Sequence, residues 1–415
     1  MRIITDLHLH SYLSRACSKQ LTLPNIAKMC ERKGIGFVGT ADAFHPLWQN
    51  EIETLLEERE KGAFYLRDGS SPTAFILQTE ISCIYKRNGH VRRVHHVLLF
   101  SNMGALKRMT QTLLGRGCNL KSDGRPIVGI DSEDLFKMAL EADPDTLLIP
   151  AHAWTPWFAI FGSQSGFDSI GECFGEMGEY IYAIETGLSS DPKMNWRLSA
   201  LDNIFLVSNS DAHSLDKIGR EANVFDMEKP SYPELRRILV EHDTEKFLET
   251  IEFFPEEGKY HADGHRACGF CCEPEESKKI KNICPRCGKL LTIGVLHRVS
   301  DLADRPPNSS RPSSAVPFRS VVPLAEIVAS VLNVSPKAKK VGKEVETMLQ
   351  EGRSEFQILL DMKQDELESI TSIEIASSIL AMRRGEVEIT PGYDGEFGVI
   401  RPRTNIKEYK QKALF

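Results

Sequence analysis

The chain has no uninterrupted apolar stretch near the roughly 20 residues that a helix needs to cross a bilayer. Its first residues lack the basic and apolar regions of a secretory signal. Five of its 10 cysteines are scattered among apolar neighbours, which is typical of reduced core thiols and not of a disulfide framework. We therefore expect a cytoplasmic protein without a membrane partner.

What is present is the composition of a globular protein. Hydrophobic residues make up 41% of the 415 residues, which is enough to bury a full core and gives no sign of overall disorder. A chain of this length usually folds as two or three domains.

Two histidine-containing motifs stand at opposite ends of the first half of the chain. A short apolar strand leads into Asp6-x-His8-x-His10, where the two-residue period of a strand puts both histidines on one face. The apolar run 204–207 leads into Asp211-x-His213. Because α/β folds carry functional groups at the carboxyl ends of their strands, we expect the two motifs to form two sides of one metal site.

Between these motifs, an apolar strand is followed by an acid or a histidine at several places. These residues are Asp42 and His45, Glu80, the pair His95 and His96, His152, and Glu185. A ring of parallel strands would gather them on one rim, whereas a single histidine after a strand is more often a hydrogen-bonded core residue. The whole set favours two or three divalent ions, Zn²⁺, Mn²⁺, Mg²⁺ or Fe²⁺, in a cluster of the kind that splits phosphoesters.

The order of these motifs resembles the PHP family, named after polymerase and histidinol phosphatase. The resemblance covers residues 1–255 and implies an α/β fold, a distorted (β/α)7 barrel with a metal cluster. It implies that His8, His10, Glu80 and Asp211 surround one metal, and that Glu80 bridges to a second metal held by His96 and His152. Asp211, Glu80 and His152 would then be the catalytic residues.

This chain departs from the family pattern at the third metal. His213 would hold that metal together with a histidine near position 45, but Thr40-Ala41-Asp42-Ala43 replaces the commoner Thr-Asp-His. His45 or Asp42 would have to substitute. The sequence also leaves open which of His95 and His96 is a ligand.

Two CxxC pairs follow the predicted barrel. Cys268 and Cys271 are separated by twelve residues from Cys284 and Cys287, close to the spacing of a tetrahedral four-cysteine zinc ribbon. Glycine and proline within the pairs favour the tight turns that wrap thiolates around an ion, and they argue against a redox-active pair on a helix. We expect a structural Zn²⁺, with Cys272 as a spare thiol that could compete with Cys271.

Charge is segregated along the chain. Residues 259–353 contain sixteen Lys or Arg and ten Asp or Glu, a net of +6, which leaves −13 for the rest of a chain whose total is −7. We expect a zinc module with a basic extended strap at 256–320 and a helical DNA-binding domain at 321–415, with helices near 323–333, 336–351 and 364–384. Arg298, Lys339 and Lys340 are candidate phosphate contacts, although a solvated surface explains such charges equally well.

The whole chain resembles the endonuclease Q branch of the PHP family, DNA repair nucleases of archaea and some bacteria. The resemblance rests on the opening motif, the cysteine pairs, and the segments PAHAWTPW at 150–157, FGSQSGFDS at 161–169, GVLHRV at 294–299 and LADRP at 302–306. It implies hydrolysis of the phosphodiester 5′ to a deaminated base (uracil, hypoxanthine or xanthine) or to an abasic site in DNA, leaving a 3′-hydroxyl and a 5′-phosphate.

Residues 154–169 combine aromatic and small polar side chains. An enzyme that inspects a base usually takes it out of the stack, and the extruded base needs aromatic faces and polar edge contacts. The candidates are Trp154, Trp157, Phe161 and Phe167 for stacking, and Ser163, Ser165 and Gly166 for contacts to a base carbonyl. The alternative is that the aromatic residues only cap the barrel. Arg15 is a candidate for a phosphate contact or for a surface ion pair.

Three other functions fit parts of this pattern. A phosphatase of small phosphate esters would share the barrel, an inactive barrel would serve as a zinc-dependent scaffold, and a lesion-independent nuclease would use the same metals. The tail at 411–415 ends in apolar residues and could be a peptide that docks on a sliding clamp, or a disordered terminus.

Overall fold

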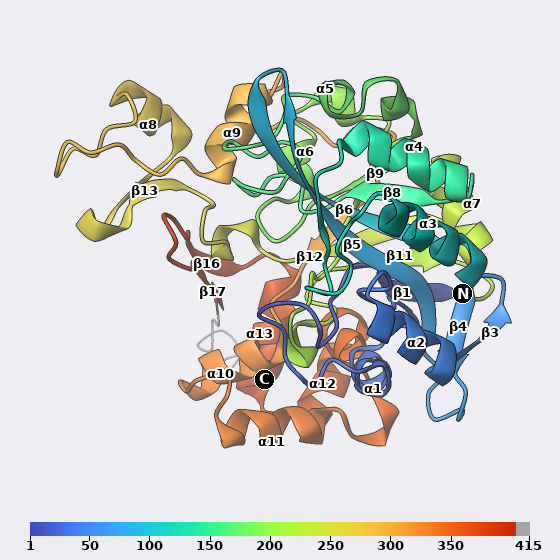
Figure 1. Cartoon of the computed structure of the whole chain (residues 1–415). Coiled ribbons are helices and arrows are strands. Elements are labelled where there is room, and N and C mark those ends of the chain that lie inside the picture. The colour runs from blue at the N-terminus through green and yellow to red at the C-terminus, as the bar shows by residue number, and fades with distance from the viewer. Residues whose placement is uncertain (404–415) are drawn as a thin grey trace.

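The computed structural model describes residues 1–403. They form an α/β body, an arm that projects from it, and a helical C-terminal region on a neighbouring side (Figure 1). Among these residues, no helix is long and apolar enough to cross a membrane. The tail at 411–415, where the sequence suggested a contact with a sliding clamp, lies outside the described residues.

One mixed sheet supplies most of the barrel wall. Its order is β15-β12-β11-β1-β2-β5-β4-β3, while β6 pairs with both β5 and β8, and β7 pairs with β5. The strands are β1 (Arg2–Asp6), β2 (Phe37–Gly39), β3 (Leu56–Glu60), β4 (Ala63–Leu66), β5 (Ala74–Arg87), β6 (His90–Phe100), β7 (Ile127–Val128), β8 (Leu147–Pro150), β11 (Ala222–Asp226), β12 (Phe247–Glu252) and β15 (Phe318–Ser320). β2 and β8 are buried along their whole length, as expected for strands that are covered on both faces.

A two-stranded sheet completes the ring. It consists of the parallel strands β9 (Ala183–Glu185) and β10 (Phe205–Val207). On one side, the N–H of Ala153, just after β8, donates to the carbonyl of Glu185 at 2.9 Å. On the other side, the N–H of His10, just after β1, donates to the carbonyl of Ala212 at 3.1 Å. These contacts close a distorted barrel, which confirms the predicted fold.

The expected ring of parallel strands is wrong in part: β11 is antiparallel to both β1 and β12, and β6 is antiparallel to its neighbours as well. β1, β2 and β5 run parallel, as do β9 and β10, but β5 and β6 form a long antiparallel hairpin and β6 is antiparallel to β8. The turn at Asn88-Gly89 has φ of 53° and 78°, the left-handed conformation that a two-residue hairpin loop of this type requires. Parallel neighbours would need a crossover connection, for which a two-residue turn is too short.

Helices cover the outside of the barrel. They are α1 (Leu23–Lys33), α2 (Pro46–Leu55), α3 (Met103–Gly115), α4 (Ser132–Ala142), α5 (Ile170–Phe174), α6 (Pro192–Asn195) and α7 (Tyr232–Val240). α1 has a proline in its first turn and ends at Gly34, whose φ of 88° is readily adopted by glycine. It buries Leu23, Ile26 and Cys30, which have the spacing of one face of an amphipathic helix.

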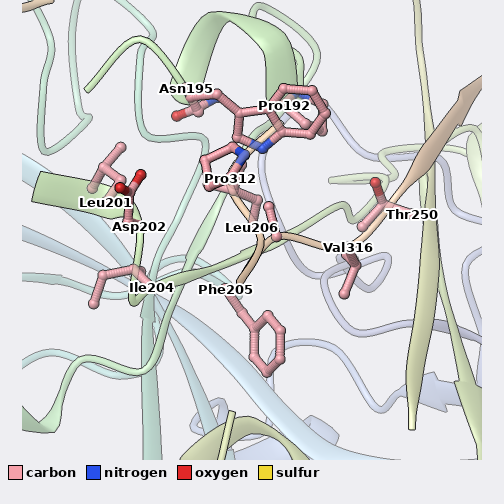
Figure 2. Close-up of a pocket in the computed structure, with 12 residues that line it drawn as sticks. Pro192, Asn195, Leu201, Asp202, Ile204, Phe205, Leu206, Thr250, Pro312 and Val316 are labelled. Carbon is pink, nitrogen blue, oxygen red and sulfur yellow. The ribbon is translucent and has the colours of Figure 1, made fainter. Parts of the chain in front are cut away.

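The arm, residues 261–294, is followed by a strap that returns along the barrel. The arm contains β13 (Asp263–His265), β14 (Phe270–Cys272) and α8 (Pro274–Lys279), and α9 (Val295–Leu302) leads out of it. In the strap, residues 304–316, Arg305 pairs with Asp202 of the barrel at 2.5 Å. A small pocket lies where the strap crosses the barrel, and Pro312 and Val316 line it together with Leu206 (Figure 2). Residues 304–316, which are rich in proline and serine, therefore form a strap along the barrel and not a free linker.

The C-terminal region packs against the barrel and the arm. Its helices are α10 (Leu324–Leu332), α11 (Lys339–Met348), α12 (Gln364–Ile370) and α13 (Ile373–Arg383). All four lie within the predicted helical ranges, but the predicted helix at 364–384 is divided into α12 and α13 at Thr371 and Ser372. Lys33 of α1 pairs with Glu355 at 2.8 Å. A last hairpin, β16 (Val387–Thr390) and β17 (Val399–Pro402), reaches the arm, where Tyr393 bridges to Ala262. This hairpin and β15, which pairs with β12, join the predicted segments 1–255, 256–320 and 321–415 to one another.

Candidate metal centre

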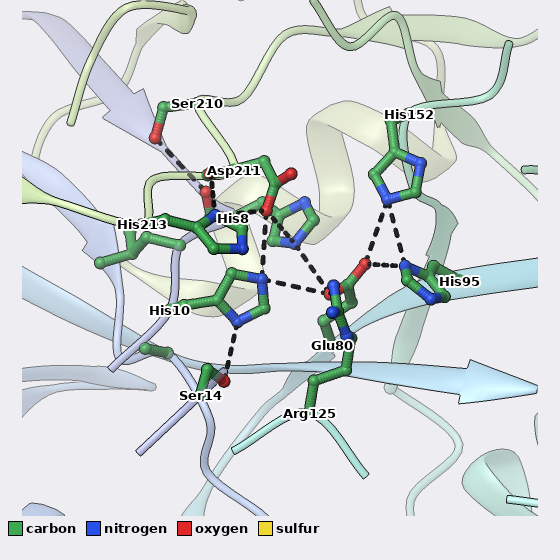
Figure 3. A network of polar contacts seen from close by, with 12 residues as sticks. His8, His10, Ser14, Glu80, His95, Arg125, His152, Ser210, Asp211 and His213 are labelled. Atoms are coloured by element: carbon green, nitrogen blue, oxygen red, sulfur yellow. Dashed lines mark hydrogen bonds and ion pairs between the residues drawn. The ribbon is translucent and has the colours of Figure 1, made fainter. Parts of the chain in front are cut away.

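Four side chains from three separate parts of the chain meet inside the barrel. His8 and His10 follow β1, Glu80 lies in β5, and Asp211 follows β10. One donor atom of each lies within 4.8 Å of the others, and we call these residues the first group. Glu80, His95 and His152 form a second group by the same distance. Figure 3 shows the side chains of both groups converging on Glu80.

Glu80 joins the two groups because its two oxygens face different histidines. Oε2 lies 3.2 Å from Nε2 of His10 and 3.7 Å from Nε2 of His8. Oε1 lies 2.7 Å from Nδ1 of His95 and 3.2 Å from Nε2 of His152. The Glu80 side chain is completely buried. A carboxylate placed in this way is suited to bridge two cations.

The unsatisfied atoms of the first group fit a metal ion. The buried atoms Nε2 of His8, Nε2 of His10 and Oδ1 of Asp211 have no hydrogen-bond partner among the described residues. The last two are 3.1 Å apart, yet they do not meet in hydrogen-bond geometry. Buried polar atoms are rarely left unpaired. Imidazole nitrogens together with carboxylates are donors that suit Zn²⁺, Mn²⁺ and Fe²⁺.

An outer layer of carboxylates orients these histidines. Nδ1 of His8 donates to Glu185 at 3.1 Å, and Nδ1 of His10 donates to Asp42 at 3.0 Å. Each ring therefore keeps its Nε2 atom for a metal. Glu185 also accepts the backbone N–H of His152 at 2.7 Å, so one carboxylate positions a member of each group.

Arg125 places a positive charge beside the shared carboxylate. Its Nη1 lies 2.9 Å from Oε2 of Glu80. The preceding residue, Gly124, lets the chain pass close to Asp42 on its way to Arg125, because a Cβ at this position would collide with the Asp42 carboxylate. Burial by itself would raise the pKa of Glu80. Its interactions with His95, which is charged at the low pH where Glu80 would take up a proton, and with Arg125 hold that pKa well below its usual value. Sequence reasoning missed Arg125, since it lies in a Gly-Arg-Pro turn with no recognisable metal-site pattern.

The centre opens to solvent on one side. His8, His10 and Glu80 are fully buried. The side chains of Asp211, Arg125 and His213 are 27%, 24% and 33% exposed. A substrate would therefore reach the centre from the side of these three residues.

His95, and not His96, belongs to the second group. The β5–β6 register places Ser82 opposite His95 and Ile81 opposite His96, so that His95 shares a face of the sheet with Glu80. His96 points to the other face, where its Nε2 lies 2.8 Å from a hydroxyl of α4. Burial lowers the pKa of His95 to about 4, which leaves its imidazole neutral and able to bind a metal. The structure thus has His95 where the family resemblance implied His96.

Two candidate ligands have a left-handed backbone. φ is 31° at His152 and 46° at Asp211. Gly187 packs directly against His152, where a Cβ would lie 2.7 Å from the His152 Cα. Such conformations cost on the order of 1–3 kcal/mol each and persist mainly at functional sites.

The residues expected at a third metal do not gather in the same way. Both ring nitrogens of His45 are engaged, by a backbone N–H at 3.3 Å and a backbone carbonyl at 3.2 Å. Asp42 supports His10 from the outer layer. His213 packs beside His10 with ring centres 4.6 Å apart. Within residues 1–403, metal-type donors gather in the two barrel groups and in one further group in the arm.

Known proteins resemble parts of this chain or all of it. The family described as the MJ0043 C-terminal domain matches residues 323–386. MJ0043 itself, from Methanocaldococcus jannaschii, is 29% identical over 289 residues, so the match spans 66% of this chain but 35% of MJ0043. YqxK from Bacillus subtilis is 30% identical over 426 residues, which are 97% of this chain and 100% of YqxK.

Solved structures match along the whole length. The crystal structure of the lesion-specific endonuclease PfuEndoQ from Pyrococcus furiosus has a TM-score of 0.87 and 30% identity, and the match covers 99% of both chains. The chain belongs to the endonuclease Q family. A second crystal structure, with a TM-score of 0.85 and 31% identity over 98% of both chains, is that of endonuclease Q in complex with a 27-mer duplex substrate that has an abasic lesion at the active site.

In this member of the endonuclease Q family, most aromatic residues of the 154–169 loop belong to the core. Trp154, Phe161 and Phe167 are at most 2% exposed. The indole N–H of Trp154 donates to Asn195 at 2.7 Å, and its ring packs on that of Phe161. In this conformation none of the three can stack on a base. Their burial favours the alternative, in which such residues cap the barrel.

The polar residues of the loop mainly form hydrogen bonds that attach the loop to β6. The hydroxyl of Ser165 donates to the carbonyl of Arg93 at 3.3 Å. The carbonyl of Gly166 accepts a hydrogen bond from the guanidinium of Arg92. Of the three polar contacts expected for a base carbonyl, Ser163 alone is partly exposed.

Trp157 differs from the other aromatic candidates because its side chain is 40% exposed. Its ring meets that of Tyr260, at the root of the arm, with centres 5.9 Å apart. The next residue, Phe158, packs on the ring of His95 with centres 4.7 Å apart. An accessible aromatic side chain is therefore next in sequence to Phe158, which contacts the second metal group.

The arginines expected to contact phosphate are engaged within the protein. Nε of Arg298 donates to the carbonyl of Phe161 at 2.9 Å, and its Nη2 pairs with Asp168 at 2.6 Å. Arg298 therefore ties α9 to the aromatic loop. Arg15 is largely exposed and pairs with Asp123 at 3.2 Å, as in the ion-pair alternative.

Lys339 and Lys340 behave differently from these arginines. Both are exposed at the start of α11, and neither forms an ion pair among residues 1–403. Their ammonium groups are therefore available to an anionic partner.

The arm holds the further donor group. His265, Cys268, Cys284 and Cys287 each offer an atom within 4.8 Å of the others. The sequence predicted the three cysteines of this group, but it placed Cys271 where the structure has His265. Three thiolates and an imidazole suit a tetrahedral Zn²⁺.

Proposed function

We propose that this chain is a lesion-specific DNA repair endonuclease that hydrolyses the phosphodiester 5′ to a deaminated base (uracil, hypoxanthine or xanthine) or to an abasic site. The observation that carries the proposal is Glu80 shared between two groups of metal-type donors. This centre lies in a chain that matches a solved lesion-specific endonuclease over 99% of its length.

The donor sets name the residues that would hold the metals. His8, His10, Glu80 and Asp211 would hold one cation, and Glu80 would share a second with His95 and His152. The imidazole content favours Zn²⁺, Mn²⁺ or Fe²⁺ over Mg²⁺. When bound, such cations activate water and offset the negative charge that builds up on a phosphodiester during in-line attack.

Arg125 is suited to bind the substrate phosphate. Its contact with Glu80 uses Nη1, and a guanidinium has further N–H donors arranged to meet phosphate oxygens. It lies at the open side of the centre, together with the exposed part of Asp211. A phosphodiester entering there would meet the guanidinium before it reached the buried histidines.

Trp157 is the best candidate for the contact with the lesion. An abasic site has no base to read, so its recognition depends on side chains that fill or probe the gap in the stack. Trp157 is exposed, aromatic and next to Phe158, which packs on His95. Partly exposed Ser163 remains a candidate for the edge of a deaminated base. Lys339 and Lys340 would contact the DNA backbone farther away.

The decisive experiment compares end-labelled DNA duplexes that differ at a single position. One set carries uracil, hypoxanthine, xanthine or an abasic site, and the matched duplex is intact. Each is incubated with the protein and Mn²⁺, Mg²⁺ or Zn²⁺, with Asp211→Ala as the inactive control. We expect one cut immediately 5′ to each lesion, with a 3′-hydroxyl and a 5′-phosphate, and no cut in the intact duplex.

The other outcomes identify the alternative functions. Equal cleavage of intact and damaged duplexes would indicate a lesion-independent nuclease. Hydrolysis of small phosphate esters without any DNA cleavage would indicate a phosphatase. In the same assay, Trp157→Ala should reduce cleavage at the abasic site, while Trp196→Phe, a change in a partly buried tryptophan of the barrel, should not.

A further inference from the structure

We propose that the structural metal of the arm is bound by one histidine and three cysteines, His265, Cys268, Cys284 and Cys287, and that Cys271 is not a ligand. The ligand class is a tetrahedral Zn²⁺ with one nitrogen and three sulfur donors. This site is independent of the barrel centre and of the reaction proposed for it.

The pairing of β13 with β14 separates His265 from Cys271. His265 lies opposite Phe270, and Gly264 lies opposite Cys271. Residues directly opposite in an antiparallel pair share a face, and successive residues alternate between faces. His265 and Cys271 therefore point to opposite faces of this hairpin.

The face of Cys271 is already covered by another part of the chain. Gly264, opposite Cys271, lies so close to the ring of Tyr393 that a Cβ there would collide with it. Tyr393 belongs to the turn between β16 and β17. Cys271 thus faces the C-terminal hairpin, whereas Nδ1 of His265 lies 3.6 Å from Sγ of Cys287 on the other face.

The spacing of the ligands supports the same set. His265 and Cys268 are separated by two residues, as are Cys284 and Cys287. The turn after the second pair closes through Gly288, whose N–H donates to the carbonyl of Cys284 at 2.9 Å. The pair of His265 and Cys268 thus takes the place of a CxxC pair, three residues closer to the N-terminus than Cys268 and Cys271. The CxxC pattern that begins at Cys268 is then coincidental.

The arm has a small apolar core of its own. Its buried apolar cluster consists of Cys272, Cys284 and Leu291, with Cys268, Phe270 and Ile280 partly buried against it. A cluster of this size does not stabilise a fold of this length, so the bound metal would contribute a large part of its folding free energy. The carboxylate of Asp394 accepts the N–H of Arg266, next to His265, at 2.7 Å. Metal binding by His265 would therefore also fix the position of Arg266, to which the C-terminal hairpin is hydrogen-bonded.

The test replaces Zn²⁺ by Co²⁺ or ¹¹³Cd²⁺ in the full-length protein. Thiolate charge-transfer bands of Co²⁺ report the arm alone, because the donor groups of the barrel contain no cysteine. We expect the spectra and the ¹¹³Cd chemical shift of the unaltered protein to indicate three thiolates and one nitrogen. A signature of four thiolates would overturn the proposal.

Matched variants give a second readout, the affinity for Zn²⁺ in competition with a chelator. His265→Ala should weaken binding by at least about 10-fold, and Cys271→Ser should change it less than about 2-fold. His265→Cys should restore binding and add a fourth thiolate to the Co²⁺ spectrum. Loss of zinc in Cys271→Ser with retention in His265→Ala, or unchanged binding in both, would contradict the proposal. None of these measurements depends on DNA cleavage, so they are separate from the test of the proposed function.

Discussion

The barrel centre and the arm are both built to hold metals, but the protein prepares them differently. In the barrel, ligands as far apart in sequence as His8 and Asp211 are brought together by a buried sheet, and outer carboxylates such as Glu185 orient them. In the arm, the ligands lie between residues 265 and 287, and the buried apolar cluster is small. The barrel centre is therefore preformed by packing, whereas the arm, with the proposed ligand set, would depend on a bound metal for its structure. Metal loss should abolish chemistry in one region and folding in the other.

The largest expected effect is the loss of activity without loss of structure in the barrel. Asp211→Asn replaces a charged carboxylate donor of the first group by a neutral, weaker amide oxygen, so cleavage of a lesion duplex should fall by more than the roughly 100-fold that loss of an outer partner can cause. The melting temperature should not fall, because the centre is held by packing. Asp68→Asn, at an exposed position, is the control. Unfolding of Asp211→Asn would show that the barrel also depends on its centre for structure.

A smaller loss of activity is expected from the outer layer. Glu185→Gln keeps the shape of the side chain but weakens its hold on Nδ1 of His8 and on the N–H of His152. Activity and metal affinity should drop by about 10- to 100-fold, and excess metal should restore part of the activity. Activity is measured as a function of Mn²⁺ concentration, with Glu179→Gln at an exposed position as the matched variant. Unchanged metal dependence would mean that Glu185 does not orient the ligands.

Metal removal should separate the two regions structurally. After treatment with a strong chelator, limited proteolysis should cut within the arm, residues 261–294, because its small apolar cluster cannot hold the chain. The barrel should remain resistant and keep its near-ultraviolet circular dichroism. Re-addition of Zn²⁺ should restore protection of the arm. Proteolysis that begins in the barrel would show that the barrel, and not the arm, depends on its metals for structure.

An effect on stability alone, and not on catalysis, is expected at a buried acid away from the metals. Burial raises the pKa of Glu252 to about 8 from its usual 4.5, although the hydroxyls of Thr250 and Thr186 donate to it. Between pH 4.5 and 8 the folded protein therefore holds a proton that the unfolded chain has released, and stability is lost as the pH rises through this window. The slope should approach about 1.4 kcal/mol per pH unit for this proton.

Glu252→Gln should flatten that pH dependence, measured as the free energy of unfolding from pH 5 to 9. The exposed variant Glu245→Gln should leave it unchanged. An identical slope in Glu252→Gln would assign the proton to another group, such as Glu221, whose pKa burial also raises well above its usual value.

Local patterns identified most of the donors that gather in the barrel centre. The two-residue period of a strand placed His8 and His10 on one face, and the rule that functional groups follow strands identified Glu80, His152 and Asp211. The C-terminal helical ranges were also predicted, because an amphipathic helix carries its period within its own residues, but the break between α12 and α13 was not. The hairpin of β5 and β6 was missed because the significance of Asn88-Gly89 was not recognised.

The sequence by itself determined which kinds of donor are present and in what order they come. Only the tertiary structure decided which of two adjacent candidates faces the metal: His95 and not His96, and in the arm His265 and not Cys271. These choices depend on the register between strands, and a shift by one residue would exchange the faces. The burial of Trp154, the exposure of Trp157 and the approach of Arg125 to Glu80 likewise result from packing between distant segments, which no local pattern contains.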